Sequence, residues 1–361
     1  MRQYNRKLVL ENGMEIPGFA FGAKEDKILE LVFNTSMVGY QEILSDPSYT
    51  DQAVVMTYPL IGNYGMSDED YESKNPSVGA MIVREYNEEP SNWRSRETLA
   101  SVMTKYGISG VSGVDTRRLT RIIREYGSAK VLITGMETST EEAMSILNGT
   151  ELAHDQVARV TAKEQYTVTP AKVGYHVVAV DCGMKLNIVR ELMAHGCKVT
   201  VMPCSATARD INAVSPDGIF ISNGPGDPTD AVSVIELVRE LKGKYPIFGI
   251  CLGHQIISLA YGAKTYKLKF GHRGGNHPVM DIETGKIEIT SQNHSYAVDP
   301  KSIEGTGLKV THINLLDDTV EGVSCEEDKV FSVQYHPESA PGPVDSTYLF
   351  DRFIKMMEKH L

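Results

Sequence analysis

Short apolar runs alternate with amphipathic stretches through the second half of the chain, and this alternation limits its fold more than any other feature. The apolar runs that indicate strands lie at 177–180, 199–202, 218–222 and 247–250. Apolar residues with helical spacing lie between them at 186–194 and 234–241. Repeated strand–helix–strand units favour a mainly parallel sheet with helices on both faces. We therefore expect an α/β fold here, with antiparallel strands after residue 270 and a closing helix over 349–357.

A cysteine stands where the last of these strands should meet a helix. The run Pro246–Ile250 ends at Cys251, and an apolar stretch closed by Gly262 follows. Gly249 and Gly253 flank Cys251 at two residues on either side, where a sharp turn leaves no room for a Cβ atom. This arrangement is typical of a nucleophile held above the edge of a sheet, and a helix start and a histidine base would both favour the thiolate. The alternative is a buried structural cysteine.

The sequence His336-Pro337-Glu338 is the best candidate for the base and its partner. If a strand continues through His336, the side chains of His336 and Glu338 face the same side. A carboxylate beside an imidazole fixes its tautomer and stabilises the imidazolium that proton transfer forms. The alternative is a solvated turn at a strand end. A cysteine elbow in the same α/β domain favours the catalytic interpretation.

The glycine-rich run Ser222–Pro228 follows another strand and offers backbone N–H groups. Glycines there permit conformations that expose these groups, and with the N–H of Leu252 they predict an oxyanion hole. A phosphate-binding loop is less favoured because no G-K-[ST] follows. The run also fits a tight strand-to-helix turn, which is compatible with either role.

No metal site is expected from residue spacing. The histidines His272, His277 and His294 form no helical H-x-x-x-H pair, and no cysteine pair joins them. We expect His254, on the helix after Cys251, to be a structural residue.

The first half of the chain predicts a small α+β domain. A hairpin is expected around Asn12-Gly13, and helices are expected over 99–106, 115–126 and 139–149. A polar, aperiodic stretch at 158–173 predicts a linker between domains at 1–157 and 174–361. Two domains suit a chain of 361 residues.

Composition excludes some function classes. A formal net charge of -11 argues against nucleic-acid binding, which needs clustered basic residues. The sequence contains no run of about 18 apolar residues, so no membrane span is predicted. The cysteines are odd in number and scattered, which favours free thiols and a cytoplasmic location.

The three motifs S-N-G-P-G-D-P, G-I-C-L-G-H-Q and H-P-E, in that order, resemble the class I glutamine amidotransferase domain over residues 174–361. The resemblance implies that a cysteine attacks the side-chain amide of L-glutamine, ammonia leaves and water hydrolyses the thioester. By motif matching, Cys251 would be the nucleophile, His336 the base and Glu338 its orienting partner.

The runs 33–49, 57–65, 110–117 and 274–279 resemble the carbamoyl-phosphate synthase small-subunit family, so the likeness covers nearly the whole chain. Ser295 and Tyr296 stand where that family usually has glycine and phenylalanine. The glutamine contacts that the resemblance implies are Ser48, Gly224, Gly226, Leu252, Gln255, Asn293, Ser295 and Tyr296.

The resemblance also implies a partner. A large synthetase subunit would bind ATP and Mg and make carbamoyl phosphate from bicarbonate and ammonia, for arginine or pyrimidine synthesis, while this chain needs no cofactor. The chain offers no phosphate-binding loop of its own, which agrees with ATP binding elsewhere. Two alternatives stay open: a free-standing cysteine hydrolase of γ-glutamyl compounds, and a catalytically silent regulatory subunit.

Overall fold

The computed structural model describes residues 3–360 and divides the chain into two compact units, Met1–Ala153 and His154–Leu361. The segment 158–173, expected as a linker, lies within the second unit. It contains the end of α5 (Gln156–Val160) and the strand β10 (Tyr166–Val168), which pairs with β12 (Cys197–Pro203). Elements this short show no apolar periodicity in the sequence. The segment therefore resembles a linker in its sequence, although it contains ordered structure. The roles assigned to the two domains stay predictions.

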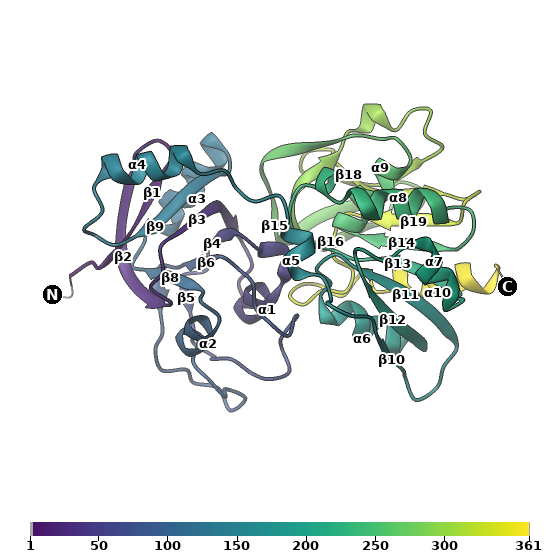
Figure 1. Cartoon of the computed structure of the whole chain (residues 1–361), viewed down its shortest axis with the longest axis horizontal. Coiled ribbons are helices and arrows are strands. Elements are labelled where there is room, and N and C mark those ends of the chain that lie inside the picture. The colour runs from purple at the N-terminus through teal and green to yellow at the C-terminus, as the bar shows by residue number, and fades with distance from the viewer. Residues whose placement is uncertain (1–2, 361) are drawn as a thin grey trace. The chain divides into compact units, whose positions relative to one another are not determined.

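The first unit is built on a closed barrel with the strand order β1-β2-β8-β6-β4-β3-β9 (Figure 1). The expected hairpin is confirmed as β1 and β2, and the α+β class is confirmed. Closure of the barrel was not expected, because it pairs segments far apart in sequence, such as β1 with β9. The barrel strands are β1 (Arg6–Leu10), β2 (Glu15–Gly22), β3 (Lys27–Asn34), β4 (Gln52–Met56), β6 (Ala80–Ile82), β8 (Ser109–Ser112) and β9 (Ala129–Thr134).

The three helices predicted in this unit are confirmed, and side chains cap their starts. Asp115 accepts a hydrogen bond from the Arg118 N–H at 2.9 Å, and Ser139 accepts one from the Glu142 N–H at 3.2 Å. The further elements are short. The elements outside the barrel are α1 (Tyr40–Ser45), η1 (Pro47–Tyr49), β5 (Leu60–Ile61), β7 (Glu85–Tyr86), α2 (Leu99–Lys105), α3 (Thr116–Tyr126) and α4 (Thr140–Gly149).

The second unit contains a ten-stranded sheet with a parallel centre. Its order is β10-β12-β11-β13-β14-β19-β18-β16-β15-β17, and the run from β12 to β19 is parallel. The parallel core and the antiparallel extension after residue 270 are confirmed. The strands not yet given are β11 (Tyr175–Asp181), β13 (Gly218–Ile221), β14 (Ile247–Ile250), β15 (Thr265–Asp281), β16 (Ile287–Val298), β17 (Lys309–Asn314), β18 (Val320–Cys325) and β19 (Val330–Val333).

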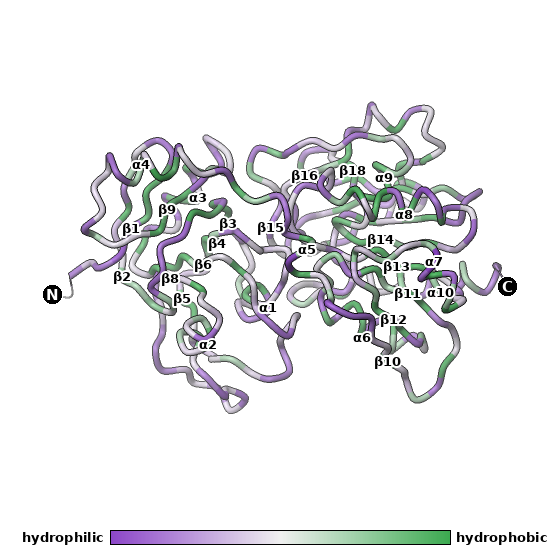
Figure 2. The backbone as a smooth tube through the Cα atoms, viewed as in Figure 1, coloured by the Kyte–Doolittle hydropathy of each residue, from purple (hydrophilic) through white to green (hydrophobic). Residues whose placement is uncertain are grey.

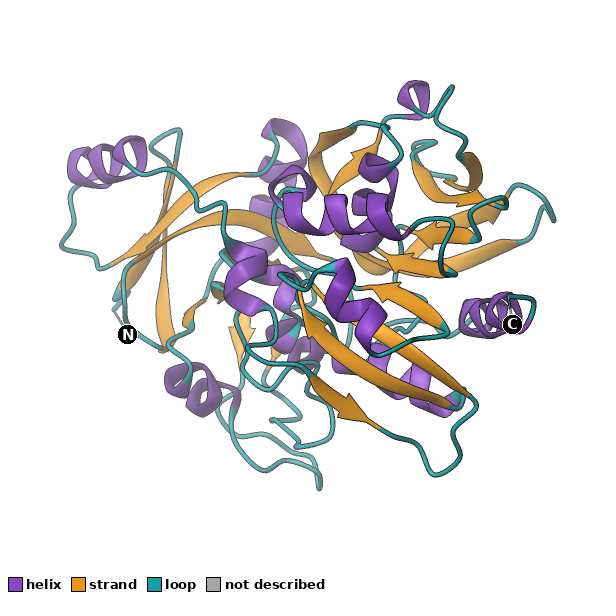
Figure 3. Ribbon diagram, turned by 45° about the vertical axis from the view of Figure 1, so that its right-hand side comes forward, coloured by secondary structure: helices purple, strands orange, loops and turns teal. Residues whose placement is uncertain are grey.

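Helices cover both faces of this sheet (Figure 3). Alternate residues of β11 point to opposite faces, so Val178 packs with α7, α8 and α9 while Val177 packs with α6 and α10. The central strands are correspondingly apolar (Figure 2). Helix α7 was not predicted, because its six residues span too few turns to show a clear helical period of apolar residues. The helices are α6 (Leu186–Ala194), α7 (Ala208–Ala213), η2 (Pro228–Asp230), α8 (Val232–Leu241), α9 (Leu252–Ala260), η3 (Pro300–Ser302) and α10 (Tyr348–Glu358).

Parallel pairing brings the carboxyl ends of β13, β14 and β19 to one edge of the sheet. The segments that follow these strands are therefore neighbours, and ligands commonly bind at such an edge. Within residues 3–360, no helix has both the length and the apolar character needed to cross a bilayer.

Helix α10 should contribute strongly to the stability of the second unit. The Phe353 side chain is fully buried, and its ring centroid lies 5.7 Å from that of Phe248. We expect Phe353→Ala to lower the free energy of unfolding by about 3–5 kcal/mol, because it leaves a cavity in the core. Urea unfolding followed by far-UV circular dichroism measures this change. Lys355→Ala, on the exposed side of the same helix, should leave the midpoint unchanged, and equal midpoints for both variants would contradict the expectation.

Candidate active site

Cys251 forms the sharp turn between β14 and α9. Its backbone angles are φ 54° and ψ -104°, a combination that residues other than glycine rarely adopt and that costs about 1–3 kcal/mol. The neighbouring strand holds this turn, since the Cys251 N–H donates to the Val333 carbonyl at 2.9 Å. The turn places the cysteine at the carboxyl edge of the sheet and at the start of α9. The predicted strand–cysteine–helix arrangement is confirmed.

Gly249 and Gly253 let α9 approach the sheet closely. A Cβ atom at Gly253 would lie 2.2 Å from the Ile221 carbonyl oxygen, and one at Gly249 would lie 2.9 Å from the carbonyl carbon of Gly253. Backbone atoms cannot move aside as a flexible side chain can. The expectation that no Cβ fits on either side of Cys251 is therefore confirmed.

His336 and Glu338 form a buried hydrogen-bonded pair. Nδ1 of His336 lies 2.6 Å from Oε1 of Glu338, and among the described residues the buried Nε2 of His336 has no hydrogen-bond partner. A carboxylate only accepts, so Nδ1 carries the proton and Nε2 is left for the thiol. No strand continues through His336, because β19 ends at Val333, so the condition considered for this pair is not met. A turn closed by a hydrogen bond from the Ser339 N–H to the His336 carbonyl brings the two side chains together instead.

The pair is electrostatically coupled. Burial alone would lower the pKa of His336, but the Glu338 carboxylate and Cys251 outweigh burial and raise it. Burial alone would raise the pKa of Glu338, but Lys185 and His336 outweigh burial and lower it. The carboxylate therefore stays ionised and favours the imidazolium at neutral pH.

Lys185 is a site residue that the sequence analysis missed. Its Nζ lies 2.9 Å from Oε1 of Glu338, the same oxygen that His336 contacts, and it also donates to the Ser339 carbonyl. The side chains of Lys185 and Glu338 are both buried. No motif marks this lysine. The only sequence feature that could have indicated Lys185 is its position just after an apolar strand, two residues beyond Gly183.

The glycine loop lies against the start of α9. A Cβ atom at Gly224 would lie 2.1 Å from the Cys182 carbonyl oxygen and 2.9 Å from Cδ2 of Leu252. Gly226 has a φ of 90°, which favours glycine. The structure therefore brings the predicted loop and Leu252 together beside Cys251.

The predicted residues of β16 form hydrogen bonds with Cys251, Gln255 and Arg273. The thiol donates to the Asn293 carbonyl, with Sγ and O 3.5 Å apart. Gln255 on α9 donates to the Tyr296 carbonyl at 2.7 Å. The Ser295 hydroxyl accepts a hydrogen bond of 2.5 Å from Arg273, so the side chain that replaces the usual glycine has its own partner.

Ser48 belongs to the first unit. It lies in η1, is buried, and its N–H donates to the Asp46 carboxylate at 2.9 Å. Its contact with glutamine stays a prediction.

His254 has the surroundings of a structural residue. It is fully buried, and its Nδ1 lies 2.9 Å from the Ser332 hydroxyl. Burial, reinforced by nearby His312, lowers the pKa of His254 to about 3. An uncharged, enclosed imidazole agrees with the expectation that it is not a second base.

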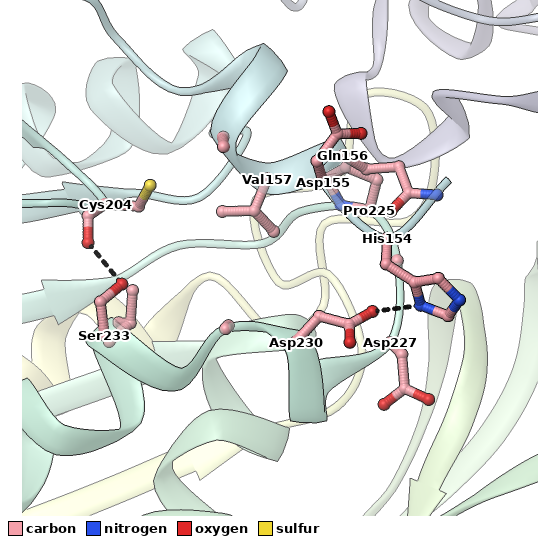
Figure 4. A pocket seen from close by; sticks show the side chains of 13 residues that line it. His154, Asp155, Gln156, Val157, Cys204, Pro225, Asp227, Asp230 and Ser233 are labelled. Carbon is pink, nitrogen blue, oxygen red and sulfur yellow. Dashed lines mark hydrogen bonds and ion pairs between the residues drawn. The ribbon is translucent and has the colours of Figure 1, made fainter. Parts of the chain in front are cut away.

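A surface pocket borders the glycine loop (Figure 4), and Cys251 is not among its lining residues. Its lining includes residues 154–158, Gly226 and Asp227. His154 Nδ1 and Asp230 Oδ2 are 2.9 Å apart on its rim, while Gln156 contacts the position that a side chain at Gly226 would occupy. The first residue of α5 therefore lies beside Gly226 of the loop.

The coupling between Glu338 and His336 predicts a measurable change. We expect Glu338→Gln to lower the pKa of His336, because the amide no longer stabilises the imidazolium. NMR titration of labelled histidines, with His336→Asn used to assign the resonance, measures this pKa. The control Glu327→Gln removes an exposed carboxylate and should leave it unchanged. An unchanged His336 pKa in Glu338→Gln would rule out the coupling.

Comparisons with known proteins cover both halves of the chain. Residues 178–356 match the family described as Glutamine amidotransferase class-I, and residues 8–133 match Carbamoyl-phosphate synthase small chain, CPSase domain. The carbamoyl phosphate synthase small chain of Fusobacterium nucleatum subsp. nucleatum is 50% identical over 359 residues, which cover 99% of each chain.

Two further relatives are the carbamoyl phosphate synthase small chains of Bacillus caldolyticus and Listeria innocua. They are 51% and 49% identical to this chain, of which each match covers 98%. The matches cover 97% and 96% of those proteins, respectively. Because the likeness extends over nearly the whole length, the chain belongs to the family of carbamoyl phosphate synthase small chains, as a glutamine-hydrolysing member.

Proposed function

We propose that Cys251 attacks the side-chain amide of L-glutamine, that His336 transfers the protons and that Glu338 orients the imidazole. The observation that carries this proposal is the 2.6 Å hydrogen bond between His336 and Glu338, which leaves the buried Nε2 of the imidazole without a hydrogen-bond partner within residues 3–360. The base is thus oriented by the carboxylate and has a free nitrogen for the thiol proton, as covalent catalysis by a thiol requires.

The chemistry proceeds in two halves. His336 takes the thiol proton as the Cys251 sulfur forms a bond to the amide carbon of glutamine. It then gives that proton to the amide nitrogen as the carbon–nitrogen bond breaks, so ammonia leaves. Water then attacks the glutamyl thioester while His336 takes up its proton. Glutamate departs, and the proton returns to the sulfur.

Backbone N–H groups would stabilise the negative oxygen of each tetrahedral intermediate. Leu252 is the first residue of α9, where N–H groups have no acceptor within the helix. Gly224 and Gly226 lie in the loop packed against Leu252 and would supply further donors.

The glutamine contacts that the family likeness implies extend this proposal. In the second unit, Gln255 and the backbone of Asn293, Ser295 and Tyr296 would contact the substrate, and Ser48 stays a predicted contact. The hydrogen bonds of Gln255 and Arg273 to this part of β16 would hold its backbone ready for glutamine.

The proposal includes a large synthetase chain as partner. That chain would bind ATP and Mg and combine the ammonia with bicarbonate, while the hydrolysis here needs no cofactor. Ammonia released into neutral water becomes ammonium, which has no lone pair for attack, so an enclosed path to the partner is required. A cytoplasmic location fits five buried cysteines that are all free.

The assembled complex provides the central test. We expect Cys251→Ala to reduce glutamine-dependent carbamoyl phosphate synthesis by about 1,000-fold or more, because the thioester cannot form. Synthesis from added ammonia should survive, since it bypasses the thiol.

A matched control is Cys325→Ala, which removes another buried cysteine away from the site and should retain both activities. Loss of both activities from a Cys251→Ala complex that still assembles would refute the division of labour. Full glutamine-dependent activity in that variant would identify a silent subunit instead.

The partner should also control the thiol. We expect glutaminase turnover of the purified chain to rise by about tenfold or more when the large chain is added, a size typical of coupling between sites. Steady-state glutamate release, with and without the partner, measures the effect. Full turnover by the isolated chain, unchanged by the partner, would favour a free-standing hydrolase.

A further inference from the structure

Three buried side chains from different strands converge at His294 of β16, within the segment that we propose to contact glutamine. One nitrogen each of His272 and His294 and a carboxylate oxygen of Glu321 all lie within 4.8 Å of one another. His272 on β15 and His294 on β16 are directly paired in register, and Glu321 comes from β18. Their exposed fractions are 7%, 5% and 0%.

Each imidazole is held by the nitrogen that points away from the cluster. His272 Nε2 lies 2.8 Å from the Asp317 carboxylate, and His294 Nδ1 donates to the Tyr296 carbonyl at 2.7 Å. Metal-binding histidines are oriented in this way, by a carboxylate or a backbone carbonyl on the distal nitrogen. The carbonyl also fixes the tautomer of His294, so its Nε2 carries a lone pair.

The inward nitrogens are left without hydrogen bonds. Among the described residues, neither His272 Nδ1 nor His294 Nε2 has a hydrogen-bond partner, although both are buried. The nearest carboxylate contact joins His272 Nδ1 to Glu321 Oε1 at 3.7 Å, too long for a hydrogen bond. An unpaired buried polar group costs about 1–3 kcal/mol, so two such nitrogens facing a carboxylate indicate a missing ligand.

We propose that His272, His294 and Glu321 bind a divalent transition-metal ion, with zinc as the best fit to two imidazoles and one carboxylate. Three such ligands leave a fourth position for water or for His277, whose ring centroid lies 4.9 Å from that of His272. Binding requires small side-chain movements toward bonds of about 2.0–2.2 Å. The expectation of no metal site rested on the absence of helical histidine pairs and of cysteine pairs. Here a sheet instead brings together residues that are distant in sequence.

The ion would have a structural role. His294 directly follows Asn293, whose carbonyl accepts the hydrogen bond from Cys251. A metal joining β15, β16 and β18 would therefore fix the strand that borders the thiol without touching the reacting atoms. This role is separate from the proposed hydrolysis, which needs no metal.

A proton is the alternative occupant. Burial lowers the pKa of His272, but Asp317 and Glu321 outweigh burial and raise it to about 9. In that case the cluster would be an ion pair only, and it would bind no metal.

Metal binding by the purified full-length chain tests the proposal. After removal of metals with EDTA, titration with Zn²⁺ by calorimetry should show one equivalent bound per chain. Co²⁺ should give the visible bands of a nitrogen- and oxygen-ligated ion, without thiolate charge transfer, and Cys251→Ala should give the same spectrum. These readouts do not depend on glutamine hydrolysis, so the proposed function can fail or hold independently.

Variants locate the ion. His272→Asn and Glu321→Gln each remove a ligand, so we expect Zn²⁺ affinity to fall by at least about 100-fold, and Asp317→Asn, which only orients His272, should lower it about tenfold. His312→Asn removes another buried histidine of the same sheet, outside the three ligands, and should leave affinity unchanged. Circular dichroism checks that each variant folds.

Three outcomes would overturn the proposal. The first is that the native chain binds no stoichiometric Zn²⁺ or Co²⁺. The second is that both ligand variants bind as tightly as the native chain. The third is a thiolate–cobalt band that Cys251→Ala removes, because it would place the ion at the catalytic thiol.

Discussion

Parallel pairing of β14 with β13 on one side and with β19 on the other determines where the chemistry of this molecule lies. All three strands end at the same edge, so the glycine loop, Cys251 and the turn that carries His336 become neighbours although they are far apart in sequence. The Cys251 N–H continues this ladder by bonding to Val333. The ladder therefore fixes both the position of Cys251 and the start of α9.

The balance of buried charges at this edge of the sheet depends on one carboxylate oxygen of Glu338. Oε1 of Glu338 contacts both Lys185 and His336, at 2.9 Å and 2.6 Å, and all three side chains are buried. Removing Glu338 would leave the buried Lys185 ammonium without its carboxylate partner, which is strongly destabilising. The set thus supports the fold of the turn as well as the state of the imidazole. A neutral residue in place of Glu338 would have to support both the fold of the turn and the state of the imidazole.

The site residues that could be predicted from the sequence are those that a local motif marks. Cys251 was identifiable because a strand, two glycines and a helix mark its position, and His336 and Glu338 because they are adjacent in a motif. Lys185 escaped because its partner is distant in sequence and neither residue carries a periodic signal. The same limit explains the unexpected barrel closure and the convergence of His272 with Glu321, since strand pairing over long separations leaves no local trace. Family likeness supplied the substrate, which no residue pattern specified alone.

The backbone at Cys251 has a consequence for how this chain can evolve. Its positive φ is strained for every residue that carries a Cβ atom, whereas glycine adopts such angles freely. Replacement of the cysteine by glycine would therefore relax the turn and remove the sulfur in the same step. Selection for stability alone would drive this position away from cysteine. The proposed nucleophile thus marks a place where function and stability oppose each other.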